Sequence, residues 1–308
     1  MKKQKQPPKL RRILVGGLFA LTALAIAGML VYMHAIARIV HVERVTLYLE
    51  DLPPGFDGKT ILFVSDIDMV GLNGPGSAAR LMESLERLEP DILILGGDYA
   101  GNSLLDKLNS TGDELALEED RRELFSAIGD FHAPLGKFAV AGENEAGADD
   151  LAAELALGRI TYLDDSGGSI RLGNEEIRIV GISDYSQGSA GYTDIASEVS
   201  ERDCVIAVTH NPSSISAMMT AEAGDTGQWC DVILTGHTHG GQIRLGERSL
   251  IKLTQQESRY PTGWTKESGV FILVSPGAGC ETVNLRFGTQ AQVHLMTLKR
   301  ASLSWGSQ

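Results

Sequence analysis

The sequence is poor in cysteine, and it has neither internal repeats nor low-complexity tracts. Cys204, Cys230 and Cys280 are the three cysteines among 308 residues, and three thiols cannot all pair within one chain. Each lies singly beside an apolar, strand-like run. We therefore expect buried free thiols, with a disulfide between two of them as the weaker alternative. The length suits a membrane segment followed by one large α/β domain.

Basic side chains are scarce outside the N-terminus. Residues 1–40 carry seven Lys or Arg and no acid, whereas residues 41–308 carry 20 basic and 40 acidic side chains, a net charge of −20. Phosphate backbones are bound by basic surfaces, so this acidity argues against nucleic acid as a partner. Most of these acids are expected on a solvated surface, and the composition also permits a site for divalent cations.

One long apolar run stands near the N-terminus. Residues 13–33 comprise 21 residues without a charge, which is enough to cross a bilayer as one helix. The preceding Lys and Arg residues favour a cytoplasmic N-terminus and an external remainder. We expect an uncleaved signal-anchor over 13–36, because the run is longer than the apolar core of most signal peptides. The sequences AIA at 35–37 and RRIL at 11–14 leave a cleaved, exported form as the alternative.

Apolar runs that predict strands alternate with helical patterns in the rest of the chain, which indicates an α/β fold with sheets covered on both faces. Strands are predicted at 59–66, 91–98, 137–143, 204–210 and 231–238, and in late runs at 241–245, 269–277, 282–288 and 291–298; helices are predicted at 77–89, 115–130, 148–157, 192–200 and 212–223. The predicted segments are a basic cytoplasmic tail (1–12), the anchor (13–36), a linker with the first strand (37–58), one catalytic domain (59–300) and a tail (301–308).

Several predicted strands end in the same way, with an apolar run followed at once by Asp, Glu or His. The residues at these ends are Asp66, Asp68, Asp98, Glu143, Asn144, His210, His237 and His239. Singly, such an Asp is usually a cap or turn residue, and a lone His is usually a core or surface residue. The GHTHGG sequence is more specific, because its glycines allow close approach to two imidazoles. Parallel strand ends meet along one rim of a sheet, where four carboxylates and three imidazoles suit two divalent metals.

The ordered set SDID, GGDY, GENE, THNP and GHTHGGQI resembles the motifs of the calcineurin-like metallophosphoesterases. The resemblance covers nearly all of 43–300, including VSPGAGCETVNLRFG at 274–288. It is closest to a bacterial membrane-anchored or exported branch related to UDP-diacylglucosamine diphosphatases and the YkuE-type phosphoesterases. It implies a four-layer α/β/β/α sandwich and a metal-dependent hydrolase of phosphoester or pyrophosphate bonds, acting on a phosphorylated small molecule or lipid.

The resemblance also implies a ligand set for two divalent ions. One ion would be held by Asp66, Asp68, Asp98 and His239, and the other by Asp98, Glu143, His210 and His237, with Asp98 bridging. Such ions polarise phosphoryl oxygens and activate a water for in-line attack on phosphorus. We expect Mn²⁺, with Mg²⁺, Ca²⁺, Fe²⁺ and Zn²⁺ as alternatives.

Two motifs depart from the family pattern. Asp68 replaces the histidine of DxH, while Glu143 and Asn144 replace the asparagine ligand and the catalytic histidine of GNH. Asp68 and Glu143 still offer oxygen ligands, but an amide cannot transfer a proton at neutral pH. The candidate catalytic residues are Asn144, at the position of the family's catalytic histidine, and His210. We therefore predict a remodelled dinuclear site. The alternative is a weak or inactive homologue that binds metal or a phosphorylated ligand. Glu145 is expected to support the loop.

Overall fold

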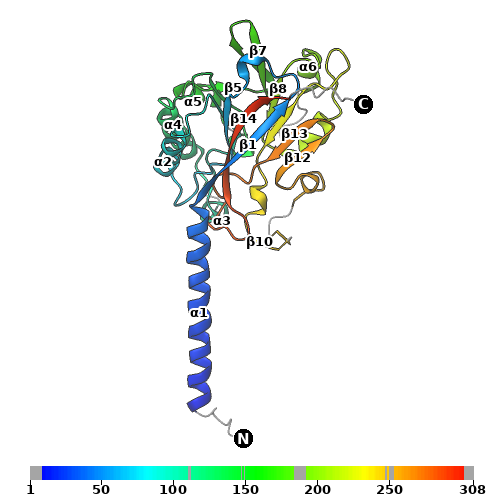
Figure 1. The fold of residues 1–308 in the computed structure, drawn as a ribbon. Coiled ribbons are helices and arrows are strands. Elements are labelled where there is room, and N and C mark those ends of the chain that lie inside the picture. The colour runs from blue at the N-terminus through cyan, green and yellow to red at the C-terminus, as the bar shows by residue number, and fades with distance from the viewer. Residues whose placement is uncertain are drawn as a thin grey trace, which may run out of the picture.

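The computed structural model describes residues 9–109, 112–146, 148, 150–183, 192–246, 248–249 and 253–301. Most of the predicted basic tail, and all but one residue of the predicted tail at 301–308, lie outside this described part. A mixed α/β domain with two six-stranded sheets follows one long N-terminal helix (Figure 1). The predicted fold class is therefore confirmed.

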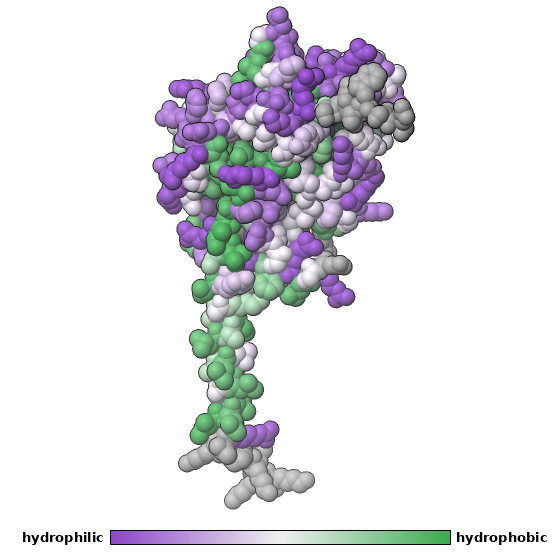
Figure 2. All heavy atoms as spheres, in the orientation of Figure 1, coloured by the Kyte–Doolittle hydropathy of each residue, from purple (hydrophilic) through white to green (hydrophobic). Residues whose placement is uncertain are grey.

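The N-terminal helix, α1 (Lys9–Ala37), contains the apolar run that predicted it. Its segment Arg11–Ala37 is long and apolar enough to cross a membrane, and none of its most apolar stretch is buried. Figure 1 shows the helix projecting away from the domain, and Figure 2 shows apolar side chains along its exposed surface. Such a surface is unfavourable in water, so the helix is a candidate membrane span by length and composition.

The first sheet has the strand order β1, β14, β2, β3, β4, β5. The bounds are β1 (Val40–Leu49), β14 (Ala291–Arg300), β2 (Thr60–Val64), β3 (Ile92–Leu95), β4 (Lys137–Ala139) and β5 (Thr161–Tyr162). Strand β1 pairs in parallel with β14 along its whole length, from Val40 opposite Ala291 to Leu49 opposite Arg300. Strand β14 is antiparallel to β2, whereas β3, β4 and β5 run parallel to β2.

The second sheet has the order β12, β13, β9, β8, β7, β6. The bounds are β12 (Gly263–Glu267), β13 (Val270–Val274), β9 (Val232–Thr235), β8 (Val205–Thr209), β7 (Glu175–Ile182) and β6 (Ser166–Leu172). The four central strands are mutually parallel. A short hairpin of β10 (Arg244–Leu245) and β11 (Arg248–Ser249) stands apart from both sheets.

The two sheets pack face to face and carry helices on their outer faces. In β2, Ile61 and Phe63 enter the core between the sheets, whereas Leu62 and Val64 pack towards the helices. This alternation explains why the strand is apolar throughout: both of its faces are covered. The helices over the first sheet are α2 (Pro75–Glu86), α4 (Glu114–Ile128) and α5 (Leu151–Leu157); α6 (Tyr192–Ser197) and α7 (Ile215–Met218) cover the second. The cysteines are buried and free, as predicted.

Several elements differ from the sequence-based expectation. Strand β12 was not predicted, and the strand predicted over 241–245 is reduced to β10. The helix predicted over 212–223 is reduced to a 3₁₀ turn (Pro212–Ser214) and the short α7, whose last carbonyl, of Met218, accepts a bond from the buried indole of Trp229. The strand predicted over 282–288 is wrong, since this segment makes one isolated bridge and its Arg286 bonds loop carbonyls. Helix α3 (Leu104–Asn109) was not predicted; it is short and buries no side chain.

Strand directions place the carboxyl ends of the central strands beside α1. Strand β1 starts three residues after α1 ends and runs away from it, and β14 runs the same way. Strands β2, β3 and β4 run in the opposite sense and so return towards α1. In Figure 1, α3 and β10 lie at this same end of the domain. Loops after the central strands therefore gather at the end from which the apolar helix leaves.

We expect the helical layer to depend on one buried ion pair. Arg121 of α4 donates to Glu154 of α5 through Nε (2.7 Å) and Nη2 (3.1 Å), and both side chains are buried. Without Glu154 the buried guanidinium keeps only the half-exposed Glu114, at 3.1 Å, so Glu154→Ala should lower the free energy of unfolding by about 3 kcal/mol, the low end of the range for a broken buried pair. Urea unfolding of the detergent-solubilised chain measures this value.

The matched control is Glu118→Ala, also on α4, whose carboxylate pairs with exposed Arg122 at 3.5 Å. Exposed pairs contribute about 0–1 kcal/mol, so this variant should remain close to the parent. An equal loss of unfolding free energy in the two variants would show that the buried pair contributes no more than the exposed one.

Candidate metal centre

The predicted site residues lie on loops that share an unusual backbone conformation. Positive φ angles occur at Asp66 (51°), Asp68 (44°), Asp98 (55°), His237 (69°) and His239 (50°). Asp and His tolerate this left-handed region better than most residues, although each such position costs of the order of 1–3 kcal/mol. Local strain concentrated at the ends of three strands indicates a functional site, because packing elsewhere must maintain it.

Two glycines allow the neighbouring loops to touch. Gly97 has φ +90°, and a Cβ there would lie 2.6 Å from the backbone nitrogen of Gly142. A Cβ on Gly142 would in turn collide with the backbone nitrogen of Asp98 at 2.7 Å. Larger residues at either position would push the loop after β3 away from the loop after β4. These contacts keep Asp98 and Glu143 on adjoining walls of one site.

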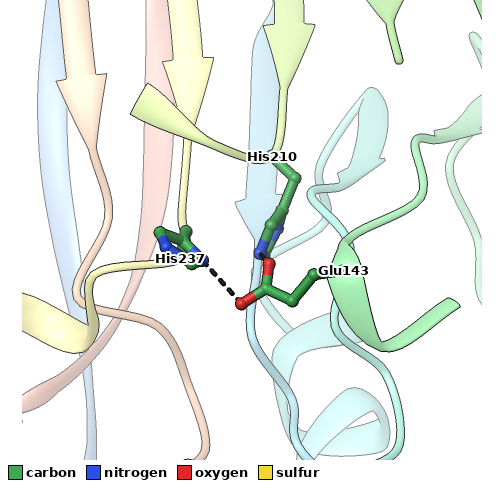
Figure 3. Close-up of side chains that lie close together, drawn as sticks. All are labelled: Glu143, His210 and His237. Atoms are coloured by element: carbon green, nitrogen blue, oxygen red, sulfur yellow. Dashed lines mark ion pairs between the residues drawn. The ribbon is translucent and has the colours of Figure 1, made fainter. Parts of the chain in front are cut away.

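One end of the site is formed by Glu143, His210 and His237, shown in Figure 3. The Oε2 atom of Glu143 lies 2.8 Å from His210 Nε2, and its Oε1 atom lies 2.6 Å from His237 Nδ1. The carboxylate thus points at both imidazoles and not into solvent. Its side chain is 35% exposed and that of His237 is 23% exposed, so this end is the open one.

The other end is formed by Asp66, Asp68 and His239, all of them buried. His239 Nε2 lies 3.4 Å from Asp68 Oδ2 and 3.7 Å from Asp66 Oδ1. Asp68, the residue in place of the motif's histidine, therefore faces the site. Asp66 is also fixed by the backbone N–H of His237, which donates to its Oδ1 at 2.8 Å.

Asp98 joins the two ends. It forms a third group with Asp66 and His210, in which His210 Nε2 lies 3.3 Å from Asp98 Oδ2 and 3.9 Å from Asp66 Oδ1. His210 Nδ1 lies 2.7 Å from the carbonyl oxygen of Gly96, which can only accept. The proton is therefore on Nδ1 in the neutral ring, and the Nε2 lone pair faces the carboxylates.

The chemistry of this cluster fits divalent metal ions. Among the described residues, the buried ligand atoms Asp66 Oδ2, Asp68 Oδ2 and His239 Nε2 lack a hydrogen-bond partner. Glu143 Oε2, His210 Nε2 and His237 Nδ1 contact only other groups of the cluster. Buried polar atoms normally have partners, and an unpaired buried carboxylate is costly. Carboxylate and imidazole groups whose ligand atoms lie within 4.8 Å of one another would be satisfied together by bound cations.

The electrostatics of the site reflect burial of many acids together. Burial raises the pKa of Asp66 to about 6, and the negative charge of Asp98 adds to the effect. Burial, Asp98 and Asp66 raise the pKa of Asp68 well above its usual value. Burial alone would lower the pKa of His210, but Asp98 and Glu143 outweigh it and raise that pKa. These carboxylates therefore hold protons tightly unless other positive charge is supplied.

The loop after β4 supports the site through its other polar residues. Asn144 donates from its backbone to Asp98 Oδ1 (3.0 Å), and its side-chain amide lies 3.4 Å from Asp68 Oδ1. Glu145 is buried and accepts from the backbone N–H groups of Asp98, Tyr99 and Gly142 at 2.9–3.0 Å. Glu145 thus ties this loop to the loop after β3, in agreement with its expected supporting role.

Two residues that the sequence did not single out adjoin the cluster. The buried guanidinium of Arg286 donates to the carbonyl oxygens of His239 (3.2 Å), Pro276 (2.6 Å) and Gly279 (2.6 Å). Glu257 Oε1 lies 3.6 Å from His237 Nε2, on the side opposite Glu143. Arg286 could have been found from the resemblance at 274–288. Glu257 follows no apolar run and carries no motif signal.

The four-layer sandwich and its cluster of carboxylates and imidazoles at the strand ends define a metallophosphoesterase. Residues 59–241 match the calcineurin-like phosphoesterase family, and the chain belongs to that family. It is 29% identical to the uncharacterized protein YpbG of Bacillus subtilis, over 89% of this chain and 93% of that protein. The uncharacterized metallophosphoesterase YkuE of the same organism is 26% identical, over 86% of each chain. Phosphodiesterase YaeI of Escherichia coli is 27% identical, over 68% of this chain and 71% of its own length.

The metal-free site should make stability fall as pH rises. Asp66, Asp68 and His210 have higher pKa values in the folded than in the unfolded chain. Each therefore stabilises the fold by its full contribution at low pH, where it is protonated. That stability is lost as pH rises through about 6 for Asp66 and through a higher pH for His210. In EDTA we expect Tm to fall between about pH 5.5 and pH 8. His239, whose pKa burial lowers, opposes the trend only below about pH 6.5.

Added Mn²⁺ should reverse the fall, because metals bind the deprotonated ligands. We expect Mn²⁺ to raise Tm by about 5 °C or more at pH 8, and by less at pH 5.5. Thermal scans at both pH values, with and without EDTA, measure the difference. A gain that is equal at both pH values, or no gain at pH 8, would count against metal binding by these acids.

Proposed function

We propose that this protein is a membrane-anchored, metal-dependent hydrolase of phosphoester or pyrophosphate bonds with a remodelled dinuclear site. The observation that carries the proposal is the convergence of four carboxylates and three imidazoles whose buried ligand atoms lack other partners. Family membership supports the reaction class. The relative YaeI is named a phosphodiesterase, which makes a phosphodiester the first substrate class to examine.

The location follows from α1 and the charge distribution. Residues 1–40 carry seven Lys or Arg and no acid, and the remaining chain has a net charge of −20. Basic residues flank cytoplasmic ends of membrane helices, so we place the N-terminus in the cytoplasm and the domain outside. The substrate is then a phosphorylated small molecule or lipid that reaches the outer face of the membrane.

Each end of the site would hold one ion. Asp66, Asp68 and His239 would hold the deeper ion, and Glu143, His210 and His237 the ion at the open end. Asp98 lies between them and would be shared. When bound, such ions polarise phosphoryl oxygens and lower the pKa of a bound water. His210 is kept as a ligand through Nε2 by its Nδ1–H bond to Gly96.

The four carboxylates favour hard cations. The family pattern carries two of them, Asp66 and Asp98, and the two substitutions add Asp68 and Glu143. Two divalent cations would then be formally balanced by the protein, so phosphate dianions should be attracted less strongly. Carboxylate oxygens also suit Mn²⁺, Mg²⁺ or Ca²⁺ better than Zn²⁺. We therefore propose two divalent ions, with Mn²⁺ as the first choice.

Two of the three changed motif positions, Asp68 and Asn144, contact each other. The amide of Asn144 lies within 3.4 Å of the Asp68 carboxylate and can donate a hydrogen bond to it. It cannot donate a proton to a leaving group, so the site lacks general-acid help from this loop. We therefore propose that the enzyme favours leaving groups that depart as stable anions, such as aryl oxides and phosphates.

Metal analysis and turnover together test this function. The purified full chain should contain bound metal and, with Mn²⁺, hydrolyse an aryl phosphodiester such as bis(4-nitrophenyl) phosphate. Asp98→Asn should lose metal and at least about 10²-fold in kcat/KM, because it removes the shared ligand. Glu118→Gln, on the surface of α4, is the control that should keep both. Metal without turnover would support the non-catalytic alternative, and absence of both would overturn the proposal.

Restoring a proton donor should widen the range of leaving groups. Asn144→His places an imidazole beside Asp68, whose negative charge would favour its protonated form. We expect kcat for an alkyl phosphodiester to rise by about 10²–10⁴-fold, with little change for the aryl phosphodiester. Asn144→Gln cannot transfer a proton and should show no such gain. An equal gain on both substrates would point to repositioning of substrate instead of general-acid catalysis.

A further inference from the structure

A second concave site lies where α1 meets the domain. This junction cavity has a volume of about 320 Å³ and lies between the end of α1, the first turns of α2 and the loops around Ile67 and Gly279. The residues that matter for its chemistry are His34, Arg38, Leu72, Arg80, Leu81 and Asn284. It adjoins the back of the loop that carries Asp66, since the Gly279 N–H donates to the Asp66 carbonyl.

The charge of the junction cavity is opposite to that of the domain. Its lining contains Arg38, Arg80 and His34 and not one acidic residue, although acids outnumber bases 40 to 20 beyond residue 40. Arg38 and Arg80 are exposed, and neither has an ion pair within the described residues. Two guanidinium groups without an ion pair and an imidazole around one hollow form a site for an anion, and guanidinium groups bind phosphate well.

The depth of the junction cavity relative to a bilayer is set by α1. The uncharged run at 13–33 has 21 residues, which at 1.5 Å per residue spans roughly 30 Å, the thickness of the hydrocarbon core. His34 and Arg38 follow this run directly. The mouth of the cavity therefore lies at the level of the lipid headgroups on the domain's side of the membrane.

The surface around the junction cavity is apolar, which suits contact with lipid. Leu72, on its rim, is 78% exposed, and Leu105 and Leu108 of α3 are 69% and 71% exposed. Helix α3 lies at the same end, because Leu104 N–H donates to Thr282 in the segment that leads to the end of α1. Figure 1 shows α3 at the end of the domain from which α1 leaves. Exposed leucines at this end would enter the interfacial layer of a bilayer.

We propose that the junction cavity binds the phosphate headgroup of an anionic phospholipid, with Arg38 and Arg80 as the main contacts. The lipid's acyl chains would lie along α1 and Leu72, and His34 and Asn284 would complete the polar wall. This site is separate from the metal centre. It depends on α1 spanning a bilayer but not on hydrolase activity, so it can fail or hold independently of the catalytic proposal.

Binding of a short-chain lipid to the full chain tests the site. The chain is kept in neutral detergent at pH 6.5 with EDTA, which prevents phosphate binding at the metal centre, and titrated with dioctanoyl phosphatidylglycerol by thermophoresis. We expect saturable binding of one lipid per chain. The double variant Arg38→Gln, Arg80→Gln should weaken it at least tenfold, whereas Arg87→Gln, an exposed control just beyond the end of α2, should leave it unchanged. Each single variant should weaken lipid binding about threefold, so the single variants still test the proposal if the double variant misfolds.

Two further probes identify the source of the phosphate. Dioctanoyl phosphatidylcholine should bind at least tenfold more weakly, since its headgroup carries no net charge, and inorganic phosphate should bind more weakly still. Equal binding of phosphatidylcholine would overturn the proposal of an anionic headgroup. Inorganic phosphate that binds as tightly as the lipid would show a site for a free anion. Unchanged binding in the double and single arginine variants would place the lipid elsewhere.

Discussion

The mutual repulsion of buried carboxylates is the constraint on which this structure depends. Asp66, Asp68 and Asp98 are almost fully buried within a few ångströms of one another, and Glu143 closes the group from the loop after β4. No arrangement of this kind is stable as four bare anions in a protein interior. Imidazoles, retained protons or bound cations must therefore supply the missing positive charge. The surrounding fold must also hold the acids together against their mutual repulsion.

The surrounding fold does so through backbone groups and not through opposite charges. Glu145 accepts three backbone N–H groups and joins the loops after β3 and β4. Arg286 does the equivalent on the second sheet, where its guanidinium bonds carbonyl oxygens from the loops after β9 and β13. Both residues leave the ligand atoms themselves unpaired. Because these hydrogen bonds hold the backbone of the loops, the side-chain ligand atoms stay available to a metal.

Much of this site could be predicted from sequence, because residue type and chain order carry the information. Asp66, Asp98, His210 and His237 each follow an apolar strand, and parallel strand ends meet at one rim. The contact between Asp68 and Asn144 could not be predicted, since it depends on how two loops far apart in the chain pack together. Glu257 lacked any periodic context, and the run at 282–288 was apolar enough to suggest a strand although its backbone curls around Arg286.

The direct passage from α1 into β1 has a mechanical consequence. Two residues, Arg38 and Ile39, separate the last residue of the helix from a strand that is paired with β14 along its whole length. A joint this short leaves little room for the domain to swing. With α1 spanning a bilayer as proposed, the metal centre would keep a nearly constant height above the lipid surface. A hydrolase anchored in this way would act within a thin layer parallel to the membrane, and phosphorylated groups above or below that layer would be out of its reach.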